Sequence, residues 1–329
     1  MTDSAASPDA STTTDRAARL GAAPRVGFFG PEGTFTEQAL RTQAELVTGT
    51  VVAYPSIRDV IVATEAGEVD YGFIPIENAI EGSVNVTLDT LVFDTDLLIE
   101  REVVIPISMC LIAPPGVTLD DITTIVSFPH AIAQCYAFMA KNLPHGVVTV
   151  AANSTADAVR DLAGSGDGHT AALGPARAAE VYGLTILAEG IEDHPENETR
   201  FVAVAPAGIP ASTGHDKSTI VVFQRADAPG SLLAILQEFA ARAINLVKLE
   251  SRPTKRGLGD YCFLIDLEGH IDDELVADCL RDLKSKHDVK FLGSYPAAGA
   301  HGPAVRREAD IAWRQADTWL SELRSQVER

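Results

Sequence analysis

Residues 25–39, RVGFFGPEGTFTEQA, contain one complete strand–turn–helix unit. The apolar run Val26–Phe29 predicts a short strand, and Gly30-Pro31-Glu32-Gly33 predicts the turn after it. Thr34 and Glu37 have the capping-box spacing, in which two side chains each satisfy a backbone N–H at the start of a helix. This stretch therefore predicts an α/β layer architecture.

The alternation of strands and helices continues toward the C-terminus. Ser56, with Asp59 three residues later, and Ser83 predict two further helix starts. The apolar stretch Leu97–Ile112 predicts a crossing into a second lobe, and Arg200–Ala205 predicts a strand that returns to the first. The remaining strands are expected at 71–76, 124–127, 147–151 and 170–173, and the remaining helices at 129–143, 155–162 and 176–182. Two crossings predict two lobes with a cleft between them, which is a good site for a small molecule.

The order of predicted strands and helices changes after residues 206–216, which are rich in Ala, Gly, Pro and Ser and indicate a linker. Strands are expected at 218–224, 245–251, 260–267 and 289–294, and helices at 230–242 and 272–286. The resulting order, βαββαβ, is the ferredoxin-like pattern of a small regulatory domain.

Composition narrows the classes of partner. The chain has 329 residues and a formal net charge of -20, which argues against nucleic acid, because phosphate binding needs a basic surface. Its four cysteines (Cys110, Cys135, Cys262 and Cys279) form no CxxC pair and are expected to be reduced core thiols. The histidines show no HExxH-type spacing, so we expect no metal and no cofactor.

The two ends of the chain differ from its middle. Residues 1–24 are polar and lack the basic start and apolar stretch of a signal peptide, so they predict a disordered tail. No apolar run is long enough to span a bilayer, and we expect a soluble, cytoplasmic protein without a membrane partner. In the tail 297–329, Trp319, Leu320, Leu323 and Val327 fall at helical spacing. That helix either docks on a partner subunit, or packs on its own domain or frays in solvent.

Five segments carry polar residues at the places where α/β sheets hold ligands, namely strand ends and helix starts. At Gly30–Ala39, Thr34 and the free N–H groups of the helix start are suited to a carboxylate. The other four segments are PIENAIEGSVNVTLD (75–89), SFPHAIAQC (127–135), NSTADAV (153–159) and ENETRFVAV (196–204).

From residue 25 to 296 the chain resembles the prephenate dehydratase family, most specifically at 75–82, 197–201 and 250–253. The resemblance implies a catalytic domain at 25–206, whose lobes (25–100 plus 190–206, and 101–189) are similar to periplasmic binding proteins. It also implies an ACT regulatory domain at 217–296. The segment before residue 25 is too short for the chorismate mutase bundle of bifunctional relatives, so the monofunctional form is expected.

The sequence departs from the family pattern at two places. The family's usual Ser-His-Pro-Gln is Ser127-Phe128-Pro129-His130 here, and Ala79 replaces a serine. Both changes fall near the expected cleft, so they bear on the fine geometry of substrate binding.

The family reaction is the loss of water and CO2 from prephenate, which yields phenylpyruvate. The resemblance assigns catalysis to Thr199, whose hydroxyl would donate a hydrogen bond to the departing ring hydroxyl. Glu77, Glu81 and His130 are the alternative acids. Further substrate contacts are expected from four neutral side chains: Thr34, Asn78, Ser83 and Ser154.

Arg200 and Phe201 each allow two interpretations. Arg200 would pair with the side-chain carboxylate of the substrate, since its planar fork suits carboxylates. It would otherwise form a structural ion pair with Glu196 or Glu198. Phe201 would be an apolar wall beside the substrate ring, or else part of the strand core.

The second domain would bind phenylalanine as an effector. The resemblance places the site at Gly230, Ser231, Leu232, Leu233, Asn245, Leu246, Glu250, Ser251, Arg252 and Pro253. The same residues are otherwise an ordinary turn before a helix and a strand end stopped by proline. Such sites form between two ACT domains, so a homo-oligomer, a dimer or a tetramer, is expected. The rival functions are an arogenate dehydratase and a non-catalytic protein that senses a ligand.

Overall fold

The computed structural model describes residues 23–224, 229–255, 257, 260–298, 318–319 and 322–326. These residues divide into two compact units. Unit 1 comprises 23–90 and 103–206, and unit 2 comprises 91–102 and the described residues from 207 onward.

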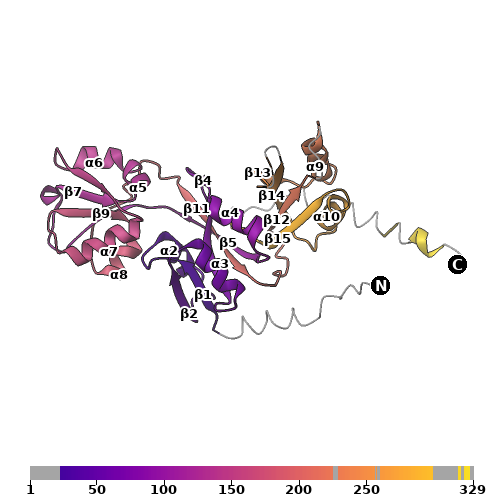
Figure 1. The fold of residues 1–329 in the computed structure, drawn as a ribbon, viewed down its shortest axis with the longest axis horizontal. Coiled ribbons are helices and arrows are strands. Elements are labelled where there is room, and N and C mark those ends of the chain that lie inside the picture. Colours follow the sequence, from indigo (N-terminus) through magenta and orange to yellow (C-terminus); the bar gives the residue numbers. More distant parts are fainter. Residues whose placement is uncertain are drawn as a thin grey trace. The chain divides into compact units, whose positions relative to one another are not determined.

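The first sheet of unit 1 has the strand order β2-β1-β3-β11-β5 (Figure 1). Its strands are β1 (Arg25–Phe29), β2 (Thr50–Tyr54), β3 (Tyr71–Asn78), β5 (Leu98–Pro106) and β11 (Glu198–Ala205), and the short β4 (Gly82–Ser83) pairs with β3. Strand β1 is parallel to β2 and β3, whereas β11 is antiparallel to β3. The helices that follow these strands are α2 (Phe35–Arg41), α3 (Ile57–Glu65) and α4 (Asn85–Asp89), with a π-helical turn at Thr90–Asp94.

The second sheet of unit 1 has the order β10-β6-β9-β7-β8 and is flanked by helices α5 to α8 (Figure 1). Its strands are β6 (Cys110–Ala113), β7 (Thr124–Ser127), β8 (Val148–Ala151), β9 (Thr170–Gly174) and β10 (Thr185–Glu189). Its helices are α5 (Pro129–Ala133), α6 (Tyr136–Asn142), α7 (Thr155–Ser165) and α8 (Ala176–Tyr182), with a 3-10 turn at Leu119–Asp121. The two sheets are the two predicted lobes.

The chain passes between the lobes twice, at 107–109 and at 190–197. The two connections are hydrogen-bonded to each other, because the Ile107 N–H donates to the Asn197 carbonyl at 2.8 Å and the Ile191 N–H to the Met109 carbonyl at 3.2 Å. We call this paired segment the hinge. Strand β5 stays in the first sheet as far as Pro106, so the first crossing comes after the residue-101 boundary expected from the sequence.

Two predicted helices differ from the structure. The expected helix 129–143 is broken after α5, because Asp193 of the hinge occupies the break: its N–H donates to the Gln134 carbonyl at 2.6 Å and its carboxylate accepts the Ala137 N–H at 3.1 Å. Ser83 does not begin a helix. It ends β4, and the N-cap of α4 is Val84, which makes no side-chain cap.

Unit 2 contains the predicted βαββαβ order. Its elements are β12 (Asp216–Phe223), α9 (Ser231–Ala240), β13 (Leu246–Pro253), β14 (Tyr261–Glu268), α10 (Glu274–Lys286) and β15 (Asp288–Pro296). The sheet order is β13-β14-β12-β15 with antiparallel pairing, so the ferredoxin-like arrangement is confirmed. Ile220, Ile235, Phe239, Ile265 and Leu283 are fully or almost fully buried in its core.

Residues 91–102 also belong to unit 2, although they precede most of unit 1 in the chain. The Lys290 ammonium donates to the carbonyls of Val92 and Thr95 at 3.1 and 2.5 Å. The side chain of Glu102 is fully buried, and its carboxylate pairs with Lys217 at 2.8 Å. These contacts attach the beginning of β5 to the βαββαβ fold of unit 2.

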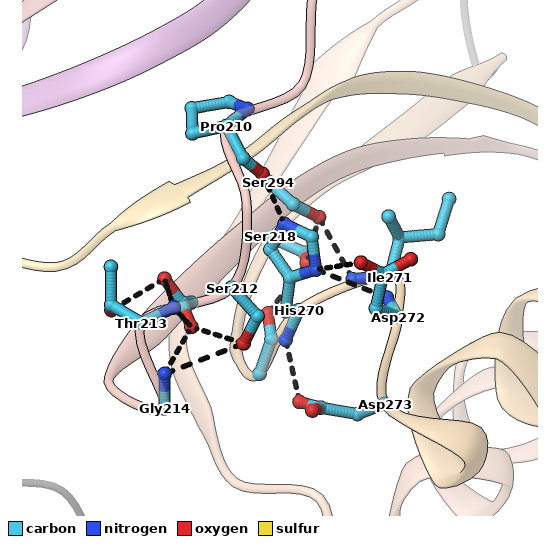
Figure 2. A network of polar contacts seen from close by, with 12 residues as sticks. Pro210, Ser212, Thr213, Gly214, Ser218, His270, Ile271, Asp272, Asp273 and Ser294 are labelled. Atoms are coloured by element: carbon cyan, nitrogen blue, oxygen red, sulfur yellow. Dashed lines mark hydrogen bonds and ion pairs between the residues drawn. The ribbon is translucent and has the colours of Figure 1, made fainter.

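Residues 207–216, which make up most of the expected linker 206–216, are joined to the rest of unit 2 by the network of Figure 2. His270 is 1% exposed, and its Nδ1 accepts the Asp272 N–H at 3.1 Å, so its Nε2 donates to the Pro210 carbonyl at 2.9 Å. The Asp216 carboxylate accepts the N–H groups of Thr213 and Gly214 at 2.9 and 3.0 Å. This stretch is therefore part of the folded unit.

All four cysteines are free and buried, as predicted. Burial raises the pKa of Cys110 to about 11 and those of Cys135 and Cys279 to about 12, so these three thiols stay protonated at neutral pH. Within the described residues, no helix has the length and apolar character needed to cross a membrane.

The two tails are described only in small part. Residues 318–319 and 322–325 are helical, with Trp319 and Leu323 exposed, whereas Leu320 and Val327 lie outside the described residues. The N-terminal tail predicted to be disordered lies outside them up to residue 22.

Candidate active site

Thr199 lies at the start of β11, opposite Asn78 at the end of β3. The register places Arg200 opposite Glu77 and then slips, so that Phe201 faces Pro75. Such a bulge re-aims the side chains at a strand end, and bulges are frequent beside active sites. Thr199 is 9% exposed, at a strand end whose neighbour Glu198 is exposed.

The Asn78 amide fixes the direction of the hydrogen bond to Thr199. Its Oδ1 accepts the backbone N–H groups of Ile80 and Glu81 at 3.0 and 2.9 Å. Its Nδ2 must therefore be the atom that faces Thr199, and it donates to Thr199 Oγ1 at 2.9 Å. Within the described residues the Thr199 hydroxyl donates to no acceptor, so its hydrogen is available to an oxygen of a ligand.

Arg200 pairs with Glu77, at 3.4 Å between Nη1 and Oε2, and its side chain is 10% exposed. The expected structural partners, Glu196 and Glu198, do not hold it, because the sheet register brings Glu77 opposite Arg200 and Glu196 bonds His194 at 3.2 Å. Arg200 directly follows Thr199 on β11, so the pair with Glu77 holds the guanidinium on the strand that carries the candidate hydroxyl.

Phe201 occupies the core. Its side chain is 1% exposed and stacks on Phe73, with ring centroids 5.7 Å apart and planes 9° apart. The position supports the second interpretation of Phe201, which is strand core, rather than a wall beside a substrate ring.

Each of the alternative acids has a polar side-chain partner. Glu81, on the turn between β3 and β4, pairs with His130 of α5 at 2.9 Å, and this contact joins the two lobes. The Phe128 ring stacks on the His130 ring with centroids 5.5 Å apart. Phe128 and His130, two of the departures from the family pattern, therefore act together at an exposed inter-lobe contact.

The three hydroxyl side chains expected to bind substrate, those of Thr34, Ser83 and Ser154, lie on three different elements of unit 1. Thr34 caps α2, accepting the Glu37 N–H at 3.3 Å, and Ser154 caps α7, accepting the Asp157 N–H at 3.0 Å. Ser154 lines a cavity of about 700 Å³ between the two lobes, together with Gly30, Pro31, Tyr54, Arg160 and others. Thr199 and Asn78 are not among the residues that line it, and Ser83 lies in the hairpin beside Glu77.

Glu37 has a role that the sequence did not reveal. In place of the expected Thr34 N–H, its buried carboxylate accepts the Gly33 N–H at 2.6 Å, together with Arg41 at 2.6 Å and Arg177 at 3.1 Å. Burial alone would raise its pKa, but the Gly33 N–H and the two arginines outweigh burial and lower the pKa. Since Arg177 belongs to α8, this cluster joins the first lobe to the second.

Two further polar residues are linked to Asn78 by hydrogen bonds and were missed, although both lie in quoted segments. Asn197 Oδ1 accepts from Asn78 Nδ2 at 2.9 Å, and Asn197 Nδ2 donates to Gln134 Oε1 at 3.4 Å. Their residue types carry no charge and no metal-binding signal that would single them out. Within the described residues no cluster of three or more His, Cys, Asp or Glu could hold a metal ion.

The expected effector residues fall on two elements of unit 2. Gly230 is the N-cap of α9 with φ +86°, a left-handed conformation that favours glycine, and Ser231 accepts from Gln224 at 2.8 Å. Leu232 and Leu246 pack against the same core, whereas Leu233 is 58% exposed. On β13, Glu250 and Arg252 pair at 2.5 Å, whereas Ser251 and Pro253 are exposed.

Comparison with known proteins gives a consistent family. The family model of prephenate dehydratase matches residues 26–208, and the ACT domain model matches 218–285. Prephenate dehydratase of Mycolicibacterium gilvum is 42% identical over 92% of this chain and 98% of its own length.

Two solved structures extend this likeness. A crystal structure of prephenate dehydratase from Arthrobacter aurescens in complex with L-Phe has a TM-score of 0.82 and 38% identity, covering 92% of this chain and 99% of its own. A quorum-quenching acylase, GqqA, has a TM-score of 0.74 and 27% identity, covering 83% of this chain and 98% of its own. Because one fold can host different reactions, the assignment depends on the matched family model and the close relatives. This chain belongs to the prephenate dehydratase family and carries a C-terminal ACT domain.

Proposed function

We propose that this protein converts prephenate to phenylpyruvate, CO2 and water, and that phenylalanine lowers its activity. The observation that carries the proposal is the Thr199 hydroxyl, which receives a hydrogen bond from Asn78 and keeps its own hydrogen for a substrate oxygen. Family membership and the L-Phe complex of the Arthrobacter relative support the activity and the effector.

The step that the enzyme must assist is the breaking of the bond between the ring and its hydroxyl oxygen. The bond from the ring to its carboxylate breaks and CO2 leaves, the electron pair of that bond forms a new ring double bond while an existing one shifts toward the carbon that bears the hydroxyl, and the hydroxyl leaves and takes up one proton from solvent to become water. Thr199 would donate a hydrogen bond to that oxygen as negative charge develops on it. A threonine hydroxyl is too weak an acid to give up its proton fully, so we assign it hydrogen bonding rather than proton transfer.

The remaining contacts divide by charge. Arg200 would meet the side-chain carboxylate of prephenate, since its guanidinium forms paired hydrogen bonds with carboxylates. Asn78 would act through Thr199. Thr34, Ser83 and Ser154 are proposed as neutral contacts on the rim of the cleft, and Phe201 as the core residue that holds β11 in place.

Phenylalanine would bind between two ACT domains, so we propose a homo-oligomer, a dimer or a tetramer. The proposed contacts are the start of α9 (230–233), Asn245, Leu246 and the end of β13 (250–253). Support comes from β13, an edge strand of its sheet that exposes the apolar side chains of Val247 and Leu249. The four reduced, buried cysteines support a reducing compartment, and we propose the cytoplasm.

We further propose to divide the chain into a catalytic domain at 25–206 and an ACT domain at 217–296, with tails at 1–24 and 297–329. The family models, which match 26–208 and 218–285, support these limits. Within the catalytic domain we expected the lobes at 25–100 plus 190–206 and at 101–189; because β5 stays in the first sheet as far as Pro106, we now propose that the second lobe begins after Pro106.

The decisive experiment incubates the purified full-length protein with prephenate and follows the formation of phenylpyruvate. A parallel sample receives arogenate and is analysed for phenylalanine, because the ring chemistry of the two substrates is the same. Turnover of prephenate supports the proposal. If only arogenate is turned over, the protein is an arogenate dehydratase instead. If neither substrate is turned over, the result contradicts an enzymatic role.

A further inference from the structure

Asn197 lies where the hinge meets the candidate active site. It is 2% exposed and directly precedes β11. Its backbone belongs to the hinge, because its carbonyl accepts the Ile107 N–H at 2.8 Å and its N–H donates to the His194 carbonyl at 3.1 Å. Its side chain belongs to the site, because it contacts Asn78, which in turn contacts Thr199.

The direction of each hydrogen bond in this chain of amides is determined. Asn78 Oδ1 is taken by two backbone N–H groups, so Asn78 Nδ2 donates both to Thr199 Oγ1 and to Asn197 Oδ1, each at 2.9 Å. Asn197 Oδ1 is thereby an acceptor, and Asn197 Nδ2 is left to donate to Gln134 Oε1 at 3.4 Å. Rotating the Asn197 amide would place two donors face to face at Asn78.

Gln134 belongs to the other lobe and is itself held by the hinge. It is the C-cap of α5, and its carbonyl accepts the Asp193 N–H at 2.6 Å. The Asn197 side chain therefore links the second lobe to Asn78, while its backbone ties the two crossings together. A shift of one lobe relative to the other would therefore displace the Asn78 side chain through Asn197.

We infer that Asn197 is a positioning residue, which holds the Asn78 amide in the orientation that directs the Thr199 hydroxyl toward the substrate. This inference rests on the proposed function and deepens it. Asn197 need not touch the substrate. Its effect on rate comes from geometry, since a misplacement of about 1 Å can cost on the order of 100-fold in rate.

The test is a double-mutant cycle between Asn197→Ala and Thr199→Ala, measured as kcat and KM for prephenate. Asn197→Ala alone is expected to lower kcat roughly 10-fold and to change KM less than about 2-fold, because an interaction used in the transition state is lost. In the Thr199→Ala background the same change is expected to cost less than about 2-fold, because the hydroxyl that it positions is gone. Equal losses in both backgrounds would overturn the inference.

Three controls keep the outcomes distinct. Circular dichroism and thermal unfolding check that each variant folds, and Asn197→Ser replaces Asn197→Ala in the cycle if the alanine variant does not. Asn142→Ala removes an exposed asparagine whose side chain bonds only its own helix, at 2.9 Å to the Phe138 carbonyl, and is expected to keep wild-type kcat. A wild-type protein that leaves prephenate unchanged refutes the proposed function itself, whereas an active wild type with an additive cycle refutes only the role of Asn197.

Discussion

At the scale of single residues, the Thr199 hydroxyl is a strong hydrogen-bond donor because it accepts a hydrogen bond from Asn78. A hydroxyl that accepts a hydrogen bond is a better donor toward the next oxygen, since hydrogen bonds in a chain polarise one another. The 2.9 Å contact from Asn78 and the 9% exposure of Thr199 place this donor at a largely dry strand end. Loss of a donor of this kind costs about 100-fold in rate or more.

We therefore expect Thr199→Ala to lower kcat by ~100-fold with the fold intact. Thr199→Ser keeps the hydroxyl and is expected to retain most of the activity. Steady-state kinetics with prephenate, beside circular dichroism of each variant, measures both. Wild-type kcat in Thr199→Ala would remove this side chain from the mechanism.

Glu37 gives a prediction about stability and pH. Its carboxylate is 1% exposed and meets two arginines, so Glu37→Gln is expected to lower the free energy of unfolding by about 2 kcal/mol at pH 7. The pKa of Glu37 is lowered in the folded state, so its contribution is complete above the unfolded pKa of about 4.3 and is lost as the pH falls through the folded pKa.

Urea unfolding of wild type and Glu37→Gln at pH 7 and between pH 5 and pH 3 checks this dependence. The difference between the two proteins should shrink toward the acid end. Glu180→Gln is the matched control, because Glu180 also pairs with Arg177 but is 66% exposed, and surface pairs contribute about 1 kcal/mol or less. A difference that is independent of pH would contradict the assigned role of the Glu37 charge.

The sequence indicated some of these residues and not others, for physical reasons. Thr199 and Asn78 lie at the ends of two predicted strands, where polar groups are candidate ligands, and the family resemblance assigned catalysis to Thr199. Their pairing across 121 residues depends on sheet register, which no local pattern encodes. Phe201 is equally apolar whether it faces a ligand or the core, so only the structure could show its stacking on Phe73.

At the scale of elements, strong local signals were predicted well and distant contacts were not. Ser56 and Ser154 cap α3 and α7 because a hydroxyl at the N-cap satisfies a free N–H of its own helix. The break between α5 and α6 escaped prediction because its cause, Asp193, lies 56 residues from Ala137 in sequence. The edge strands β2 and β10 were not predicted, although residues 51–54 and 186–188 are short apolar runs, because periodicity alone does not distinguish such a run in a strand from one in a helix or loop.

Gly293 yields a prediction for strand β15. It has φ +145°, and a Cβ added there would lie 2.2 Å from the Ile99 carbonyl oxygen, so the strand and residues 91–102 could not keep their contact. We expect Gly293→Ala to lower the stability of unit 2 by roughly 2–4 kcal/mol, from backbone strain and overpacking together.

Gly146→Ala separates these two causes. Gly146 also has positive φ, +90°, but an added Cβ would meet nothing within 4 Å, so a cost of only about 1 kcal/mol is expected. Urea unfolding measures both variants. Equal losses would show that crowding against Ile99 contributes nothing.

At the scale of the whole molecule, the two units are interleaved along the chain. The prephenate dehydratase model matches residues 26–208, yet residues 91–102 within that range are bonded to the ACT domain through Lys290 and Lys217. Composition changes sharply at 206–216 but not at 91–102, so sequence patterns could indicate the first boundary and not the second. Strand β5 begins in the regulatory unit and ends in the catalytic one, where its sheet neighbour β11 carries Thr199.

This arrangement bears on how phenylalanine would act. An effector shifts an equilibrium only by as much as it binds one state better than the other. We expect phenylalanine to lower turnover and also to raise the midpoint of thermal unfolding, by a stabilisation of about 2.7 kcal/mol at 100 times its Kd.

Leu233→Ala is the informative variant, because Leu233 is 58% exposed and its truncation costs little packing in the free protein. Loss of one apolar contact to the effector ring should raise the phenylalanine concentration for half-inhibition ~10-fold, since burying a leucine side chain contributes about 1.5–3 kcal/mol. Val150→Ala, a truncation at a 45% exposed site on β8, should leave that concentration unchanged. Turnover measured across a phenylalanine titration for the three proteins decides the matter, and an identical titration curve for Leu233→Ala and wild type would place the effector elsewhere.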